Sequence, residues 1–254
     1  MFQCEPRGDI ALMRFDRPEK KNALTPKMLA SLVSAIDTAA SARAIVLSGT
    51  GGVFCSGFDL TACRDDPDST VLADLLRGLS RAVRALRGAV CPVVVSAHGA
   101  AIAGGCALLG GADFVVADAA AKIGYPVVKL GISPAISAPF LRQLIGDGAA
   151  RTRMLDSSLI SGTRAMELGL VHECVADVSQ CEGRALELAA ELALKPRHAI
   201  AFTKRWLNQI DGSEDGPMLD AALAASMGLA AGAEERERLA AVTHRDGAHH
   251  RKHR

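Results

Sequence analysis

Two glycine-centred segments contain residue types that could hold a negatively charged oxygen, at residues 54–60 and 101–106. Each follows an apolar run typical of a buried strand, and the second opens a stretch typical of a helix. Glycine lets the main chain approach a ligand closely, and N–H groups held in place stabilise charge that develops on a carbonyl oxygen. The pattern therefore indicates two N–H donors directed at one oxygen.

Carboxylates are scarce around these segments. No Glu occurs between Glu19 and Glu167, and neither Asp nor Glu occurs between Asp118 and Asp147. Enzymes that move protons often use carboxyl groups whose pKa lies near the working pH. The sequence thus indicates a site that holds an oxyanion but lacks the usual acid and base.

The elements that position these segments alternate between strand and helix. Strands are predicted at 10–15, 44–48, 91–97 and 113–117, with helices between them. Thr25 before Pro26 predicts a helix start, and the apolar spacing over 70–87 predicts a helix. Beyond residue 145, helices are predicted at 148–156, 163–168, 180–194, 196–210 and 217–240. This order predicts an α/β domain with parallel strand pairing.

Composition excludes several classes of function. The net charge is +1, and the chain has one Trp and one Tyr, which argues against a nucleic-acid partner. Residues 88–112 are uncharged apart from His98, but Pro92 and six glycines argue against a membrane helix. Seven cysteines without a Cys-x-x-Cys motif, and no signal-peptide pattern at the start, predict a cytoplasmic protein without disulfides. We expect no metal site.

Six segments in order carry a family resemblance: residues 16–24, 54–60, 98–106, 110–113, 129–132 and 169–171. Together they resemble the crotonase superfamily, the enoyl-CoA hydratase/isomerase family, over roughly residues 5–210. The resemblance implies a crotonase (ClpP/crotonase-like) fold of stacked ββα turns with a C-terminal helical region. It divides the chain into a core domain at 1–195, a helical trimerisation region at 196–246 and a disordered basic tail at 247–254.

The resemblance also implies a ligand and its site. The substrate is an acyl-CoA thioester, with no further cofactor, and the assembly is a homotrimer or a dimer of trimers. By position, the backbone N–H groups of Phe58 and Gly104 form the oxyanion hole. The implied substrate-binding residues are Lys20, Lys21, Ala23, Ser56, Gly57, Asp59, Leu60, Thr61, Tyr125, Pro126 and Val127.

The chain departs from the family pattern at two positions that bear on the reaction. Hydratases of this family use two glutamates, and the matching positions here are Ala107 and Val127. Another residue could act in their place; the candidates are Tyr125, His98, Cys106, Lys129 and the aspartates at 65, 66 and 68. The reaction could instead need no strong base, as in decarboxylation of a malonyl-type thioester.

The sequence-based hypothesis is an enoyl-CoA hydratase/isomerase-type enzyme, a lyase or isomerase of fatty acid metabolism, that stabilises an enolate-like oxyanion. The alternatives are a malonyl-type acyl-CoA decarboxylase and a non-catalytic acyl-CoA-binding or assembly protein.

Overall fold

The computed structural model describes residues 1–64, 66, 69–230 and 232–250. The strands are β1 Phe2–Arg7, β2 Ile10–Phe15, β3 Ala44–Gly49, β4 Val93–Ser96, β5 Ala100–Ile102, β6 Phe114–Asp118, β7 Lys122–Gly124 and β8 Glu173–Val175. The α-helices are α1 Pro26–Thr38, α2 Leu60–Arg64, α3 Thr70–Gly88, α4 Gly104–Leu109, α5 Ala138–Leu155, α6 Gly162–Glu167, α7 Cys181–Ala193, α8 Arg197–Ile210, α9 Gly216–Met227 and α10 Ala233–His250. Short 3-10 turns are η1 Pro18–Lys20, η2 Pro126–Leu130, η3 Ala135–Ser137 and η4 Val178–Gln180.

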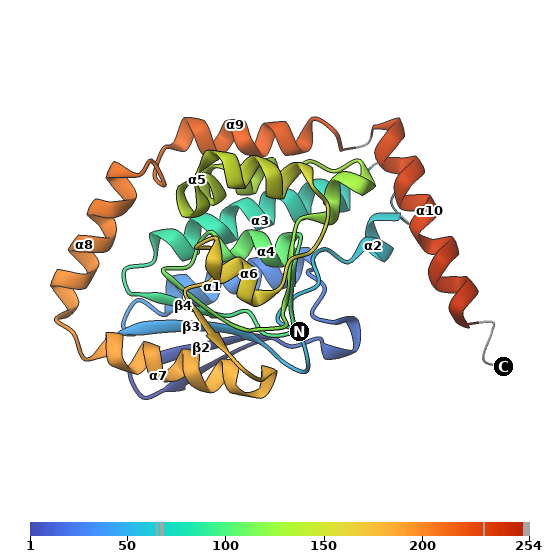
Figure 1. Cartoon of the computed structure of the whole chain (residues 1–254). Helices are drawn as coiled ribbons and strands as arrows, with labels where there is room; N and C mark the ends of the chain where they lie inside the picture. The colour runs from blue at the N-terminus through green and yellow to red at the C-terminus, as the bar shows by residue number, and fades with distance from the viewer. Residues whose placement is uncertain (65, 67–68, 231, 251–254) are drawn as a thin grey trace.

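A six-stranded sheet in the order β1-β2-β3-β4-β6-β8 forms the base of the fold (Figure 1). The pairs from β2 to β8 are parallel, as predicted, and β1 pairs antiparallel with β2. Strand β1 was missed by the sequence analysis because its residues are mostly exposed and lack an apolar pattern. A second, two-stranded sheet joins β5 to β7 in parallel.

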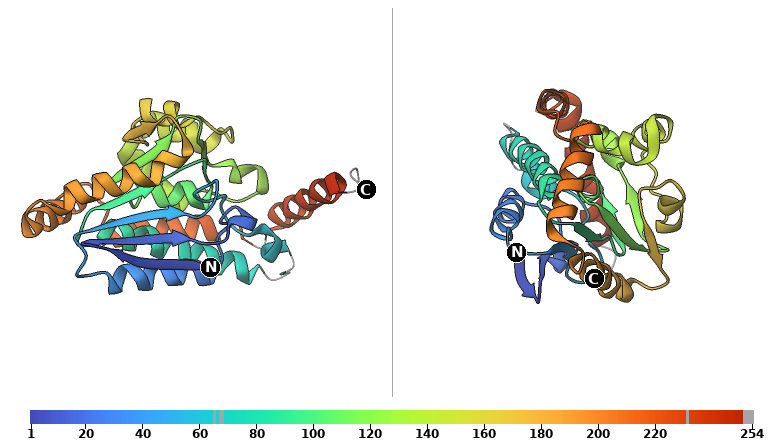
Figure 2. Two further views of the ribbon diagram at one scale, coloured as in Figure 1. Left: turned by 90° about the horizontal axis from the view of Figure 1, so that it is seen from below. Right: turned by 90° about the vertical axis from the view of Figure 1, so that its left-hand side faces the viewer.

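The alternation of side chains along the strands divides the core between the two faces of the sheet. Ile10 and Leu12 point to the face that α7 covers. Met13 and Phe15 point to the opposite face, in the larger core that includes residues of α1, α3 and α4. The views in Figure 2 show this layered arrangement, with the sheet between helices. The fold class predicted from the sequence, α/β with a C-terminal helical region, is therefore confirmed.

Local signals set several helix boundaries. The Thr25 hydroxyl accepts a hydrogen bond from the Met28 N–H at 3.2 Å, and Pro26 occupies the first turn of α1, as predicted. Asp66 accepts a hydrogen bond from the Val71 N–H at 2.6 Å at the start of α3. Asp66 therefore caps a helix; the Asp65 and Asp68 positions lie outside the described residues.

The structure adds one helix and corrects two sequence-based boundaries. Residues 60–64 form the short helix α2, for which the sequence analysis gives no prediction. The single helix predicted over 217–240 is divided into α9 and α10, because α9 ends at Met227 and the chain turns before Ala233. Helix α10 continues to His250, so residues 247–250 of the tail predicted to be disordered are helical, since extending a nucleated helix costs little. Residues 251–254 of that tail lie outside the described residues. Within the described residues, no helix has the length and apolarity needed to cross a bilayer.

Candidate active site

The two glycine segments lie side by side in the structure. Cys55 forms a parallel bridge with Ala101 of β5, through hydrogen bonds of 3.0 Å from the Cys55 N–H to Ala100 and from the Ile102 N–H to Cys55. Because of this pairing, the residues that follow Cys55 lie next to the N-terminus of α4. The pair of segments predicted from the sequence is therefore one structural unit.

Glycine is required at this junction for steric reasons. A Cβ on Gly105 would lie 2.6 Å from the Cys55 carbonyl oxygen and 2.8 Å from the Cys55 Cβ, which leaves no room for a side chain. Gly57 has φ +99°, and a Cβ there would lie 3.1 Å from the Ala103 Cβ and 3.7 Å from the Gly104 nitrogen. These glycines allow the two main chains to approach each other closely.

Both predicted donor groups lack an acceptor in the described part of the chain. Around Phe58, the hydrogen bonds run from the Leu24 N–H to Gly57 at 2.7 Å and from the Asp59 N–H to Leu24 at 3.0 Å, which leaves the Phe58 N–H unused. Gly104 is the first residue of α4, and the first N–H groups of a helix have no acceptor within it. The unused N–H groups are those expected for an oxyanion hole.

The residue before Gly104 has a strained backbone. Ala103 adopts φ 53° and ψ −113°, a combination that residues with a Cβ rarely occupy. Its N–H donates to the Gly124 carbonyl at 2.8 Å, which holds this peptide against the second sheet. Contacts with the surrounding structure thus hold Ala103 in a backbone conformation that an alanine does not favour by itself.

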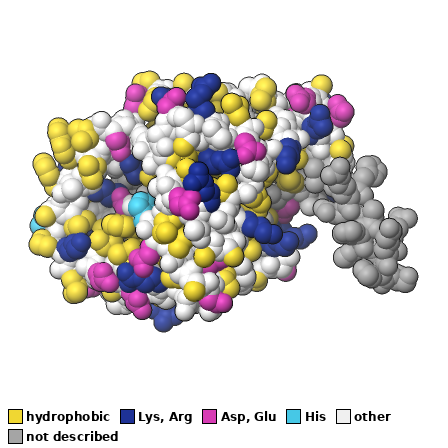
Figure 3. Space-filling view, viewed as in Figure 1, with side chains coloured by type: hydrophobic (Ala, Val, Ile, Leu, Met, Phe, Trp, Pro, Cys, Tyr) yellow, Lys and Arg dark blue, Asp and Glu magenta, His cyan; other side chains and the backbone are white. Residues whose placement is uncertain are grey.

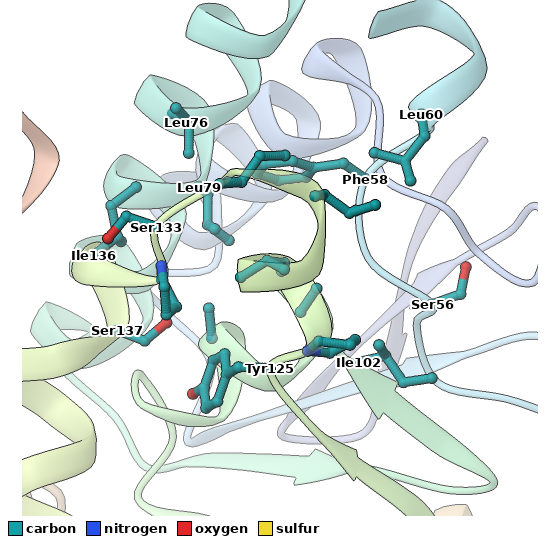
Figure 4. Close-up of a pocket in the computed structure, with 18 residues that line it drawn as sticks. Ser56, Phe58, Leu60, Leu76, Leu79, Ile102, Tyr125, Ser133, Ile136 and Ser137 are labelled. Carbon is teal, nitrogen blue, oxygen red and sulfur yellow. The ribbon is translucent and has the colours of Figure 1, made fainter. Parts of the chain in front are cut away.

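A cavity of about 140 Å³ opens beside Phe58 and Gly104 (Figure 4). Its wall contains mainly apolar side chains, and the polar ones are hydroxyls. The lining residues are Ser56, Phe58, Leu60, Leu76, Leu79, Ile102, Ala103, Gly104, Ala107, Tyr125, Pro126, Val127, Leu130, Ile132, Ser133, Pro134, Ile136 and Ser137. Among the described residues, the lining contains no carboxylate, histidine, lysine or arginine.

Ala107 and Val127, at the positions where the family resemblance implies glutamates, both line the cavity. Of the alternative acid or base residues that the structure describes, only Tyr125 does so. His98 is buried outside the cavity, where burial lowers its pKa. Burial raises the pKa of the Cys106 thiol to about 12, so this thiol stays protonated at neutral pH. Lys129 is exposed and outside the cavity lining.

The predicted substrate-binding residues divide into two sets. Ser56, Leu60, Tyr125, Pro126 and Val127 line the cavity, as do Phe58 and Gly104, the residues predicted to form the oxyanion hole. The remaining six residues lie outside the cavity lining, on the loop before α1 or around α2: Lys20, Lys21, Ala23, Gly57, Asp59 and Thr61. Lys20, Lys21 and Thr61 are exposed, whereas Ala23 is buried.

Two residues outside the predicted site hold this loop in place. The Arg17 guanidinium donates to the Asp59 carboxylate at 2.7 Å. Burial tends to raise the pKa of Asp59, but the hydrogen bond and charge of Arg17 outweigh it, so the pKa is lowered. Asn22, fully buried at φ 54°, donates to the Thr50 and Val53 carbonyls at 2.9 and 2.8 Å. Both lie in a segment that carried the family resemblance, but their roles depend on distant partners.

The wall formed by Ile132, Ser133, Ile136 and Ser137 was also missed. Ser226 of α9 fixes this wall: its hydroxyl accepts from the Ile136 N–H and donates to the Ser133 carbonyl, both at 3.1 Å. The contact joins residues about ninety positions apart, so no local sequence pattern could reveal it.

Comparison with known proteins agrees with this geometry. The enoyl-CoA hydratase/isomerase family model matches residues 5–226. An enoyl-CoA hydratase of Mycobacterium tuberculosis is 32% identical over 213 residues, which cover 82% of this chain and 80% of that protein. A hydrolase of the same organism, named for a dioxo-indene carboxyl-CoA, is 30% identical over 81% of this chain and 83% of its own length.

Solved structures show the same fold. The crystal structure of an enoyl-CoA hydratase/isomerase from Xanthobacter autotrophicus Py2 superposes with a TM-score of 0.85 at 28% identity, covering 97% of this chain and 93% of that one. The structure of an enoyl-CoA hydratase from Bacillus halodurans gives 0.83 at 26% identity, covering 94% and 99%. The chain belongs to the enoyl-CoA hydratase/isomerase family.

Proposed function

From this family membership and the cavity, we propose that the protein is an acyl-CoA thioester enzyme that stabilises an enolate-like oxyanion. The observation that carries the proposal is the pair of unused main-chain N–H groups, at Phe58 and Gly104, on the wall of an apolar cavity. The thioester carbonyl oxygen accepts hydrogen bonds from both groups. Its acyl group enters the cavity, and the CoA part lies outside, along the loop before α1 and helix α2.

The two donors act on charge that develops during the reaction. When the carbon next to a thioester gains electrons, negative charge builds on the carbonyl oxygen, and fixed N–H donors stabilise that charge more than they stabilise the neutral ground state. The donors need no reorganisation because Gly105, Gly57 and the Cys55–Ala101 bridge hold both main chains in place. The apolar wall excludes water and strengthens the interaction.

Outside the cavity, Lys20 and Lys21 are exposed cations on the same loop as Ala23. We assign them to the phosphate groups of CoA, since an ammonium group pairs with phosphate as a point charge. The Ser56 N–H donates to the Lys21 carbonyl at 3.1 Å, which ties this loop to the first glycine segment. Binding of CoA and placement of the thioester are thus coupled through one pair of main chains.

Ala107 and Val127 limit which reactions the protein can catalyse. Hydration needs a group that activates water, and the cavity-lining residues that the structure describes offer only hydroxyls for this role. A second candidate, decarboxylation of a malonyl-type thioester, is favoured by this observation because loss of CO₂ forms the enolate without a base. The substrate carboxylate, placed against Leu76, Leu79 and Ile136, also loses hydration. This loss raises the free energy of the carboxylate before CO₂ is released.

We further propose that the protein assembles as a homotrimer or a dimer of trimers through helix α8. Phe202, Trp206 and Ile210 recur every four residues on this helix and are 69%, 55% and 61% exposed. Figure 3 shows hydrophobic side chains gathered at the left edge of the molecule, where Figure 1 shows α8. Covering such a stripe removes apolar surface from water and stabilises an assembly.

We assign the protein to the cytoplasm because all seven cysteines are free thiols, five of them buried.

The proposed function is tested with purified protein and two substrates, crotonyl-CoA for hydration and methylmalonyl-CoA for decarboxylation. We expect slow or no hydration and measurable decarboxylation. Hydration at rates typical of the family would contradict the importance of Ala107 and Val127. Calorimetry with butyryl-CoA tests the ligand separately: absence of binding would refute the acyl-CoA site itself.

A further inference from the structure

The two sides of the cavity differ in chemical character. Ser56 and Leu60 lie on one side, next to the loops assigned to CoA, and Tyr125, Ser133 and Ser137 lie on the other (Figure 4). The wall between them is apolar. Hydroxyl groups therefore gather at the side remote from the CoA loops, where an acyl group would end.

Tyr125 is the most buried of these three residues, with 3% of its surface exposed. It follows Gly124, the last residue of β7, whose carbonyl accepts the Ala103 N–H. The phenol lies beside the Cys106 thiol and the Ser137 hydroxyl. Burial raises the pKa of this phenol well above its ordinary value, so the hydroxyl keeps its proton at neutral pH and above. Tyr125 is thus a neutral hydrogen-bond donor.

Ser137 is held in a fixed position relative to Tyr125. It ends η3, whose Ile136 N–H donates to Ser226, and Ser226 also bonds the Ser133 carbonyl. Ser226 is 1% exposed, so water does not compete for these bonds. The wall that presents Ser137 is consequently anchored to α9.

The hydroxyl groups of Tyr125 and Ser137 have one more donor hydrogen than their mutual hydrogen bond uses. Each hydroxyl has one donor hydrogen, and a bond between Tyr125 and Ser137 uses one of the two, whichever group donates. The Cys106 thiol beside the phenol is only a weak acceptor, so one donor hydrogen is left without a strong acceptor, and both residues line the cavity. An all-carbon acyl group would leave that donor without an acceptor, whereas an oxygen atom at this position would satisfy it.

The volume of the cavity limits the size of the group. A dry cavity of about 150 Å³ holds a benzene molecule. The cavity here, of about 140 Å³, therefore accommodates an acyl group of roughly that size, such as a chain of about six carbons or one ring.

We propose that Tyr125 and Ser137 form a specificity subsite for a short acyl group that carries a keto or hydroxyl oxygen at its end remote from the thioester. The inference rests on the proposed function, since it assigns the cavity to the acyl group of a CoA thioester. The subsite selects the substrate and supplies no base. In an all-apolar cavity, an alkyl thioester would be preferred over an oxygenated thioester of equal length. The subsite shifts this preference toward the oxygenated thioester.

The test measures the affinity of three thioesters of equal length by calorimetry: hexanoyl-CoA, 5-oxohexanoyl-CoA and 5-hydroxyhexanoyl-CoA. Each is measured with the wild type, Tyr125→Phe, Ser137→Ala and the control Ser80→Ala. Ser80 is 5% exposed, as Ser137 is, but lies outside the cavity lining. Thermal unfolding of each variant shows that it is folded.

We expect the affinity of an oxygenated thioester, relative to hexanoyl-CoA, to fall roughly tenfold in Tyr125→Phe and in Ser137→Ala. The ratio should be unchanged in Ser80→Ala. Preference for the keto or for the hydroxyl thioester identifies which oxygen the subsite takes. Equal ratios in all four proteins would overturn the subsite while leaving the acyl-CoA site intact. If the wild type binds none of the three thioesters, the proposed function fails as well.

Discussion

Cys55 and Ala101 pair as a single parallel bridge, and Phe58 and Gly104 each stand three residues farther along the two paired chains. Equal spacing from one bridge brings the two unused N–H groups to the same wall of the cavity. The bridge sets the pairing register of the two chains, and a shift of one chain by one residue would move one N–H donor away from the other.

Replacing Gly104 by proline removes its N–H and tests the donor directly. Proline is tolerated in the first turn of a helix, so α4 can still form. We expect turnover of the thioester to fall on the order of 10²–10³-fold, the typical effect of losing one such donor.

Gly104→Ala serves as the matched control for this variant. It retains the N–H but places a Cβ 3.1 Å from the Phe58 ring and from Leu24. A smaller loss of kcat/KM than in the proline variant is expected. Equal losses in two folded variants would mean that crowding, rather than the N–H, explains the effect.

Restoring two carboxylates should change the reaction. Because positions 107 and 127 both line the cavity, the double variant Ala107→Glu, Val127→Glu places two carboxyl groups where they can activate water. Burial raises the pKa of such groups toward neutrality. We expect crotonyl-CoA hydration to rise about 10²-fold or more over the wild type.

The corresponding double glutamine variant has the same size and no titratable group, and it should remain inactive. Overpacking at Ala107, which is 2% exposed, costs about 1–3 kcal/mol, so unfolding temperatures must accompany the rates. A wild type that hydrates crotonyl-CoA as fast as the glutamate variant would contradict this account.

The Arg17–Asp59 pair should give the loop a defined pH dependence. Because the pKa of Asp59 is lowered in the folded protein, its stabilising contribution is present above the pKa of the unfolded chain, about 4. The contribution is lost as the pH falls through the lower, folded-state pKa.

Urea unfolding of the wild type and Asp59→Asn between about pH 3 and pH 7 measures this contribution. The difference in unfolding free energy should be constant above about pH 5 and should shrink below about pH 4. Other carboxyl groups titrate in both proteins and cancel in the difference. A difference that does not change with pH would show that the ion pair adds nothing.

The contact between Gly105 and Cys55 should make Gly105 intolerant of any side chain. A Cβ there would lie 2.6 Å from a main-chain oxygen that is itself hydrogen-bonded, so we expect Gly105→Ala to lose about 1–3 kcal/mol or more of unfolding free energy. Gly148, exposed in α5 with open space around its Cα, is the control. Gly148→Ala should be neutral or stabilising by up to about 1 kcal/mol.

Helix α8 provides a test of assembly. Trp206→Asp places a charge in the centre of the exposed apolar stripe, and we expect sedimentation to show dissociation toward monomers. Leu155→Asp, at a residue of α5 that is 72% exposed, should leave the assembly unchanged. An assembly unaffected by Trp206→Asp would place the interface elsewhere.

Features with local causes could be predicted from the sequence. Thr25 and Pro26 set the start of α1 through a cap within four residues, and the spacing of leucines along residues 70–88 determines α3. The residue pattern of the two glycine segments also predicts a single site, and the structure places the two segments side by side.

Features with distant causes could not be predicted. The Cys55–Ala101 bridge joins single residues outside any long strand, and Ser226 reaches the cavity wall from α9. In the sequence, Arg17 and Asn22 stand out only as members of a segment that carries the family resemblance. In the structure, Arg17 holds the loop through Asp59 and Asn22 holds it through Thr50, partners at least twenty-eight positions away. Such contacts exist only after the chain has folded, so periodicity and turn propensity contain no sign of them.

The unused N–H groups at Phe58 and Gly104 belong to the main chain rather than to side chains. Any substitution at position 58 except proline preserves its donor while changing the shape of the cavity, since the Phe58 side chain forms part of the wall. Mutation and selection can therefore alter which acyl group fits without removing the N–H groups that we propose hold the oxygen. In this architecture, a lineage can exchange substrates one side chain at a time and remain functional at each step.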